Sequence, residues 1–479
     1  MQDFIWPLLA IRPLSSAIQM TRPLPPPVEP EPSHRHALWQ THIALALAAL
    51  LALFAGRVAA QLIQRYWPTD ALPDFAAWHS GLLPYEFLLI SQLLIVAAFA
   101  VITVRVASGR VQPRSTVATV LLSMGAIYFA VMSFRLGGAL TNSVKLGPLS
   151  ANPLPAAFHL VLSAWLLVLG LYHERGSRAA SAAGYGVGAT LVHWLTYPVL
   201  IASCLFLHYF LLEAGLSLLL ASYIPVAFGA LTITLLERTF PHREEWQPNH
   251  HDVASDVTFM VFVQILLPKV LSLFAAVTLL RFLQEHGIVL HGIWPHHLPA
   301  VAQAALMLLA ADFLRYWLHR ASHEWSPLLW RLHAVHHSPP KLYWVNVGRF
   351  HPIEKAIQFL CDAAPFILFG VSENVLALYF VFYAVNGFFQ HCNIEVRLGV
   401  LNTVISGPEL HRWHHSREVR ESNKNYGNNV ILWDLLFRSY FLPKNQSVAT
   451  LGLMNRNYPL GFLRQLRTPF VKGLDQEQE

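Results

Sequence analysis

Charged residues are scarce in this chain of 479 residues, because Asp, Glu, Lys and Arg together make up only 13% of it. Hydrophobic residues make up 54%, and the mean hydropathy is +0.42. Since a soluble globular domain carries about 25% charged residues, this composition excludes that class and indicates a membrane protein. Cysteine is scarcer still. Cys204, Cys361 and Cys392 form no CxxC pair, so we expect neither a disulfide framework nor a thiolate metal site.

The chain also lacks a concentrated run of basic residues, although its formal net charge is +6. Lys and Arg are spread over many loops, which argues against a nucleic-acid partner. A cleavable signal peptide is not expected either, because the Pro-rich stretch 23–32 makes the segment before the first apolar run too long and too polar. We therefore predict that residues 1–40 form a disordered cytoplasmic tail.

Long apolar runs in the sequence predict the fold class. Each is long enough to cross a bilayer as a helix, and none shows the alternation of a barrel strand. The runs cover residues 43–63, 84–104, 116–134, 156–172, 194–213, 216–236, 257–280 and 299–318. We predict an all-α, polytopic transmembrane helical bundle with a histidine-rich helical cap on its cytoplasmic side.

The orientation follows from the positive-inside rule. Arg105, Arg110 and Arg114 fall in one loop, and Arg175 and Arg178 fall in the next loop on the same side, so this side is predicted to be cytoplasmic. Counting spans from there places segment 237–245 and everything after residue 318 on that side too. A broken apolar stretch, 356–390, contains Pro365 and Gly370 and suits a helical hairpin that enters the membrane and returns.

The chain divides into two blocks on this pattern. Residues 41–185 form a membrane block of about four helices without a chemical motif, residues 190–460 form the block that carries the chemistry, and residues 461–479 form a C-terminal tail. The stretch 175–188, rich in Ala, Gly, Ser and Arg, is the predicted linker. Its glycines Gly184, Gly186 and Gly188 are typical of a flexible loop here, because no strand precedes them as in a nucleotide-binding loop.

Histidines cluster in the second block with a spacing that indicates metal binding. There is one HxxxH group and there are two HxxHH groups, and positions i, i+3 and i+4 lie near one another on a helix. The groups are His319 and His323; His333, His336 and His337; and His411, His414 and His415. Eight imidazoles exceed the capacity of one ion, which implies two ions of Fe, Zn, Cu or Ni. A structural zinc site would need four ligands and would usually include thiolates.

Two other interpretations of the histidines stay open. They could be interfacial polar residues without a metal, or they could hold ions transiently in a membrane metal transporter or sensor. Transport would place ligands near the middle of the spans, whereas these histidines follow the spans. His286, His291, His296 and His297 also cluster, but they fall in a loop predicted on the opposite side, so we assign them no metal role.

The three histidine stretches resemble the histidine boxes of the fatty acid hydroxylase/sterol desaturase superfamily in order and spacing. They read DFLRYWLHRASH at 312–323, LHAVHHS at 332–338 and LHRWHHS at 410–416, and the likeness extends to FPHREEW at 240–246 and NYGNN at 425–429. The resemblance covers about residues 190–460. It implies a non-haem centre of two Fe ions, with O₂ as co-substrate, that hydroxylates or desaturates a lipid such as a sterol, fatty acyl chain or ether lipid.

The chain differs from some members of the superfamily in one position of the histidine pattern. Some members place a further HxxxH between the second and last boxes, whereas this chain has Asn386 and His391 there. His391 becomes a ninth candidate ligand, and Asn386 is a possible outer-sphere residue. His351 and Asp312 are further outer-sphere candidates; Asp312 precedes His319 by two helical turns, so we expect that it accepts a ring N–H from a ligand.

No flavin, dinucleotide or haem motif is evident, so we expect electrons from a separate ferredoxin, cytochrome or reductase. The protein would then be a multi-pass membrane protein with its active site on the cytoplasmic side.

Overall fold

The computed structural model describes residues 32–78, 84–141, 152–178, 187–274, 278, 280–286, 292–444 and 446–474. Within them the chain is helical, with only isolated β-bridges between loops. The all-α fold class predicted from the sequence is therefore confirmed. Residues 1–31 and the glycines Gly184 and Gly186 lie outside the described residues, so the tail and linker predictions remain predictions for them.

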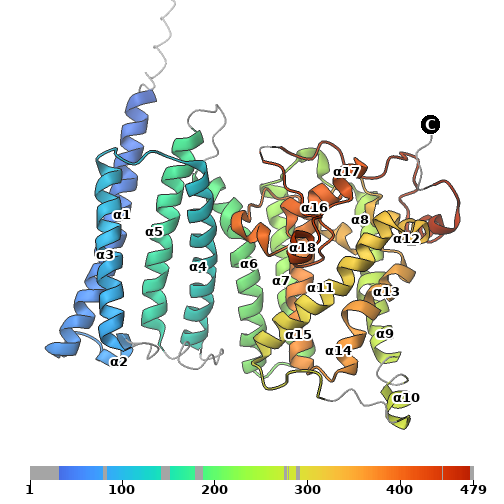
Figure 1. The fold of residues 1–479 in the computed structure, drawn as a ribbon, viewed down its shortest axis with the longest axis horizontal. Helices are drawn as coiled ribbons and strands as arrows, with labels where there is room; N and C mark the ends of the chain where they lie inside the picture. Colours follow the sequence, from blue (N-terminus) through green and yellow to red (C-terminus); the bar gives the residue numbers. More distant parts are fainter. Residues whose placement is uncertain are drawn as a thin grey trace, which may run out of the picture.

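The N-terminal block is a bundle of long apolar helices with one short helix between the first two (Figure 1). Its helices are α1 (Pro32–Tyr66), α2 (Phe75–Trp78), α3 (Tyr85–Ala107), α4 (Ser115–Thr141) and α5 (Pro153–Arg178). Helix α1 begins at Pro32, so residues 32–40 are helical and not the disordered segment that the composition predicted.

The second block surrounds the histidines with helices that differ in length. Its long helices are α6 (Val187–Glu213), α7 (Leu218–Thr239), α11 (Ala300–Glu324) and α15 (Glu373–His391). A further span is built from α8 (His250–Phe259), the π-helix η3 (Met260–Leu266) and α9 (Leu267–Phe274). The predicted hairpin consists of α13 (Pro352–Asp362), α14 (Ala364–Leu368) and α15.

Short elements close one end of this block (Figure 1). They are η2 (Glu244–Trp246), α12 (Pro327–His337), η5 (Trp344–Gly348), η6 (Gly399–Thr403), α16 (Pro408–His414), α17 (Val419–Ser422), α18 (Leu432–Leu436), α19 (Phe462–Gln465) and η7 (Thr468–Phe470). The predicted C-terminal tail is thus partly folded onto this end, since Gln465 is buried and donates to Ser338 Oγ. Helix α10 (Leu280–Glu285) lies at the other end.

Among the described residues, eight helical segments are long and apolar enough to cross a membrane, and each overlaps one of the eight predicted spans. Their outer surfaces stay apolar: Phe87 is 67% exposed and Leu94 is 66% exposed on α3. Exposure of such an apolar surface to water is unfavourable, whereas its contact with lipid is not. The fold is therefore that of a polytopic membrane protein.

Helix α6 joins the two blocks, because it packs against α4 on one side and against α7 and α15 on the other. A second contact is made by the loop at Gly399, whose neighbour Val400 donates its backbone N–H to Ser123 Oγ of α4 at 3.2 Å. Gly399 has φ +55 and lies against Trp194 of α6, so a side chain would not fit. The N-terminal block is thus docked onto the histidine-containing block.

Candidate metal centre

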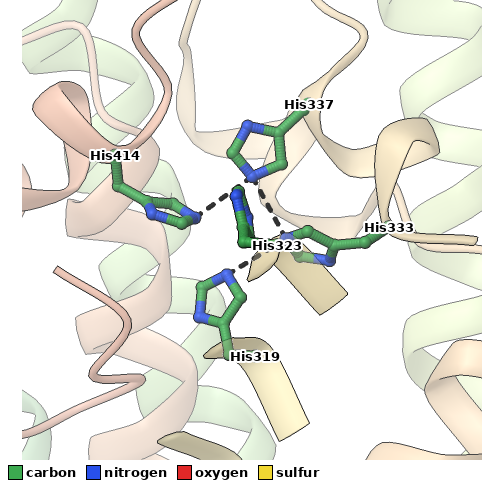
Figure 2. A group of neighbouring side chains, drawn as sticks. All are labelled: His319, His323, His333, His337 and His414. Carbon is green, nitrogen blue, oxygen red and sulfur yellow. Dashed lines mark hydrogen bonds between the residues drawn. The ribbon is translucent and has the colours of Figure 1, made fainter. Parts of the chain in front are cut away.

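Five histidines from three helices converge on one point. His319 and His323 come from the last two turns of α11, His333 and His337 from α12, and His414 from the end of α16. One ring nitrogen from each lies within 4.8 Å of those of the other four. Figure 2 shows the five rings directed toward a common centre from separate elements.

Four more histidines form a second group beside the first. They are His336 of α12, His391 at the end of α15, His411 of α16 and His415 directly after it, and all four are buried. Their ring nitrogens also lie within 4.8 Å of one another. The two groups adjoin, because the ring of His337 in the first stacks on that of His415 in the second with centroids 4.4 Å apart.

Helix geometry explains how the sequence divides the histidines. Residues four apart stay on one face, so the pairs His319 and His323, and His333 and His337, enter the first group, and His411 and His415 enter the second. The middle histidine of each HxxHH group points to the other group. Helix α12 is set in place by Ser326, whose hydroxyl accepts the N–H of Leu329 at 3.3 Å, and by Pro327 in the first turn.

The spacing of the ring nitrogens fits metal ions. In the first group Nε2 of His333 lies 3.0 Å from Nε2 of His319 and 3.1 Å from Nε2 of His337. In the second, Nε2 of His411 lies 3.1 Å from that of His391 and 3.0 Å from that of His415. Two imidazoles bound at right angles to one ion, with bonds of about 2.1 Å, would have nitrogens about 3.0 Å apart. The donor set is thus already at ligand spacing.

Outer contacts hold the opposite ring nitrogens. Nδ1 of His333 lies 2.7 Å from Glu354 Oε1, and Nδ1 of His391 lies 2.7 Å from Asn346 Oδ1. The Nδ1 atoms of four other histidines also contact acceptor oxygens. Three of these are backbone carbonyls: Tyr426 O for His319, Arg349 O for His336 and Lys424 O for His414. The fourth is the side-chain amide oxygen Asn423 Oδ1, for His323. When Nδ1–H donates outward in this way, the lone pair of Nε2 is left for a metal ion.

The electrostatics favour neutral imidazoles. Burial lowers the pKa of His414 to about 4, and burial together with neighbouring histidines lowers the pKa values of His333, His336 and His337 well below the ordinary value. Near pH 7 these rings are therefore uncharged and able to act as ligands. The buried Nε2 atom of His323 has no hydrogen-bond partner, and its Nδ1 atom contacts Asn423, so this nitrogen is left for a bound ion.

A cavity of about 390 Å³ adjoins both groups. His319 and His333 of the first group and His336 and His411 of the second line it, together with apolar residues from α7, η3, α9, α13 and α15. A pocket of this size suits a small molecule or one segment of a lipid.

The structure brings all nine predicted ligands into the two groups, although their binding of metal remains a prediction. The three outer-sphere candidates lie elsewhere. Asp312 accepts backbone N–H groups of Asn429 and Val430 and contacts no histidine of the groups. His351 caps α13 and lies 3.3 Å from Leu466 O, and Asn386 accepts the hydroxyl of Tyr197 at 2.8 Å.

The sequence interpretation missed the residues that do contact the ligands, above all Glu354 and Asn346. Their signal is weak. Glu354 is a single acidic residue in the first turn of a short amphipathic helix, and Asn346 belongs to the short 3-10 helix η5, which carries no motif. Helix α11 extends beyond the predicted span 299–318 to Glu324, so His319 and His323 lie in its last two turns.

Comparison with known proteins agrees with this arrangement of long apolar helices and two histidine groups. The family model for fatty acid hydroxylase matches residues 304–439. An ornithine lipid hydroxylase, OlsE, of Rhizobium tropici is 32% identical over 283 residues, which cover 58% of this chain and 84% of the relative. No solved structure matches.

Other relatives match over a shorter part of this chain. An alkylglycerol monooxygenase of Xenopus tropicalis is 29% identical over 30% of this chain and 31% of the relative. A Delta(7)-sterol 5(6)-desaturase of Aspergillus fumigatus is 30% identical over 31% of this chain and 40% of the relative. The chain belongs to the fatty acid hydroxylase/sterol desaturase superfamily, as the histidine boxes predicted.

Proposed function

We propose that this protein uses two metal ions, physiologically iron, and O₂ to hydroxylate or desaturate a membrane lipid. The observation that carries the proposal is the pair of adjacent histidine groups, in which seven of the nine histidines are buried, at the wall of a cavity. The names of the relatives support the substrate class, because an ornithine lipid hydroxylase, an alkylglycerol monooxygenase and a sterol desaturase all act on lipids.

The chemistry requires a reductant besides O₂. Hydroxylation converts a C–H bond to C–OH while O₂, two electrons and two protons supply the oxygen atom and one water; desaturation removes two hydrogens from the lipid and yields two waters. A bound di-iron centre would supply the oxidising power. No flavin or haem motif is evident in the sequence, so the electrons are assigned to a separate ferredoxin, cytochrome or reductase.

The residues of the chain have other tasks. The nine histidines would hold the ions, five in one group and four in the other. Glu354 and Asn346 would fix the orientation of His333 and His391. The cavity wall would hold the lipid so that one C–H bond faces the ions, and its apolar residues would keep water away.

The helices α12 and α16, which carry most of the histidines, lie at the end of the bundle where α3 ends and α6 begins (Figure 1). The basic segments 105–114 and 175–178 belong to this same end. Because such basic loops face the cytoplasm in most membrane proteins, we assign the site to the cytoplasmic side. Electrons from a cytoplasmic carrier could reach it there.

The alternative function is that of a membrane metal transporter or sensor. It would need ligands that exchange their ion easily with solvent or with a second site along a path. Buried ligands whose rings are fixed from outside by Glu354, Asn346 and backbone carbonyls favour a resident ion instead.

Comparative lipid mass spectrometry tests the proposal. Cells that make the intact protein are compared with cells that make His336→Ala, and His297→Ala serves as the control because His297 is exposed and precedes α11, at the end of that helix far from His319. We expect a lipid that gains one oxygen atom, or loses two hydrogens, only with the intact protein and the control. Metal analysis of the purified protein should give two irons per chain.

Two results would contradict the proposed chemistry, and a third would contradict catalysis as such. One is metal that exchanges freely, with no O₂ uptake when a lipid and a chemical reductant are added; this would favour transport or sensing. The other is turnover with NAD(P)H alone, which would contradict the separate electron donor. An unchanged lipid profile in cells that make iron-loaded protein would indicate a scaffold without catalysis.

A further inference from the structure

A buried lysine faces the cavity beside the histidines. Lys355 of α13 is 5% exposed and lines the cavity. Among the described residues it forms no ion pair with a carboxylate; its Nζ contacts only the Gln358 Oε1 atom at 3.5 Å and the Tyr383 hydroxyl at 3.3 Å. An ammonium group has three N–H donors, and both of these contacts are long and neutral. The charge of Lys355 is thus poorly compensated for a buried position.

The nearest charged pair does not supply the missing anion. Asp362, one helix turn beyond Gln358 on α13, forms an ion pair with Arg315 of α11 at 2.6 Å. Arg315 and Asp362 both line the same cavity and both are largely buried. Asp362 therefore compensates Arg315, and Glu354, the other carboxylate at the cavity wall, contacts His333, so neither carboxylate forms a hydrogen bond with Lys355 Nζ.

An unpartnered hydroxyl provides a second, independent observation. Tyr379 of α15 is 9% exposed and lines the cavity, and its hydroxyl has no hydrogen-bond partner. Its ring stacks on that of Tyr383, with centroids 5.7 Å apart, and the Tyr383 hydroxyl is the one that contacts Lys355. Two helices therefore present unused donors, Lys355 Nζ and the Tyr379 hydroxyl, on the same polar stretch of wall.

This polar stretch lies close to both histidine groups. The neighbour of Lys355, Glu354, contacts His333 of the first group. The Nζ of Lys355 is 5.8 Å from the ring centre of Phe350, and that ring stacks on His336 of the second group with centroids 4.1 Å apart. Only one side chain thus separates Lys355 from each group, which leaves little room for a long hydrocarbon between them.

An apolar part of the cavity leads away from the histidines. Leu376 and Phe380 of α15 line it together with Val226, Ile265 and Ile367. Leu376 precedes His391 by about four helical turns, roughly 22 Å along α15. A hydrocarbon tail fits in this direction, and not between Lys355 and the histidines.

We propose that Lys355 and Tyr379 bind an anionic oxygen group of the lipid substrate, a carboxylate or a phosphate, with the tail in the apolar part of the cavity. The oxidised carbon then belongs to the part of the lipid near its polar group and not to the end of its tail. This inference rests on the proposed function for the oxidation, but the binding of the anion does not depend on it.

The test measures lipid binding to the purified, iron-loaded protein by native mass spectrometry, with three lipids that share an oleoyl chain. Oleate carries a carboxylate, oleoyl lysophosphatidate carries a phosphate, and monoolein is neutral. The variants are Lys355→Met, Lys355→Arg and Tyr379→Phe, and the matched control is Lys444→Met, since Lys444 is exposed and does not line the cavity.

We expect the wild type to bind at least one anionic lipid about tenfold more tightly than monoolein, a preference that Lys355→Met abolishes. Lys355→Arg and Lys444→Met should retain it, and Tyr379→Phe should weaken it. The anionic lipid that binds identifies carboxylate or phosphate. If Lys355→Met does not fold, as judged from its iron content, the wild type, Lys355→Arg and Tyr379→Phe still decide the question.

Equal binding of all three lipids by the wild type, or a preference unchanged in Lys355→Met, would overturn the anion site. The two proposals fail separately. Lys355-dependent binding without O₂ uptake for any lipid would refute the oxidation and support the anion site. If monoolein is oxidised as efficiently as both anionic lipids, and independently of Lys355, the anion site is refuted and the oxidation is supported.

Discussion

The Nδ1 atom of His333 and the Oε1 atom of Glu354 lie 2.7 Å apart, although the two residues are on different helices and no sequence motif links them. Both side chains are buried, and Gln358 donates to the same oxygen at 3.0 Å. The position of the His333 ring is therefore set by α13. Such outer contacts usually govern metal affinity almost as strongly as the ligands themselves.

Glu354→Ala should accordingly weaken iron binding by about 10- to 100-fold, as measured by competition with a chelator of known affinity. Glu354→Gln, which keeps an acceptor oxygen, should lose much less. Glu373→Gln is the control, since Glu373 is exposed at the far end of α15. Unchanged iron affinity in Glu354→Ala would mean that the contact does not orient a ligand.

Asn346 should have the corresponding effect on the second group. Its Oδ1 atom lies 2.7 Å from Nδ1 of His391, and the residue is fully buried. Asn346→Leu keeps the size but removes the acceptor, so we expect iron content after dialysis to fall below that of the wild type. Asn346→Asp should retain iron. Equal iron in Asn346→Leu and the wild type would exclude this role.

Removal of the metal should destabilise the protein. Nine imidazoles crowd their Nε2 or Nδ1 atoms into two small volumes, and the buried Nε2 atom of His323 has no hydrogen-bond partner. An ion that binds only the folded state adds its binding free energy to stability, about 2.7 kcal/mol at a free concentration 100 times the Kd. We expect the chelated protein to unfold at a lower temperature in a fluorescence melt and to recover when iron is restored.

The increase in unfolding temperature on iron addition can be compared between His336→Ala and the wild type. This variant should gain less from added iron, because one ligand of the second group is missing. A shift equal to that of the wild type would place the stabilising ion outside the two groups.

The contact between the two blocks can be tested at Gly399. An added Cβ would overlap Ser123 Oγ and lie 2.7 Å from Trp194, and the φ of +55 is itself unfavourable for alanine. Gly399→Ala should lower the free energy of unfolding by about 1–3 kcal/mol. Gly461→Ala should have little effect, since nothing lies within 4 Å of its added Cβ and its φ is −78. The midpoint of the fluorescence melt in detergent checks both variants, and equal midpoints would show that the loop can move aside.

The sequence predicted the spans and the convergence of the histidines because both depend on local patterns. A run of apolar residues determines a span by itself, and His333 and His337 share a face because of helix periodicity alone. Which histidines of α11, α12, α15 and α16 share one group depends on how these helices pack, which no local pattern contains. Asp312 shows the same limit: its spacing suited a ligand contact, but the loop at Asn429 folds against it and takes both carboxylate oxygens.

The helices α12 and α16 each contribute to both histidine groups: α12 supplies His333 and His337 to one and His336 to the other, and α16 supplies His414 and His411. Neither group can be ordered without fixing the same two backbones that carry the other. The first ion to arrive therefore prepares the place of the second, so the pair should fill cooperatively and chains with a single ion should be rare at intermediate supply.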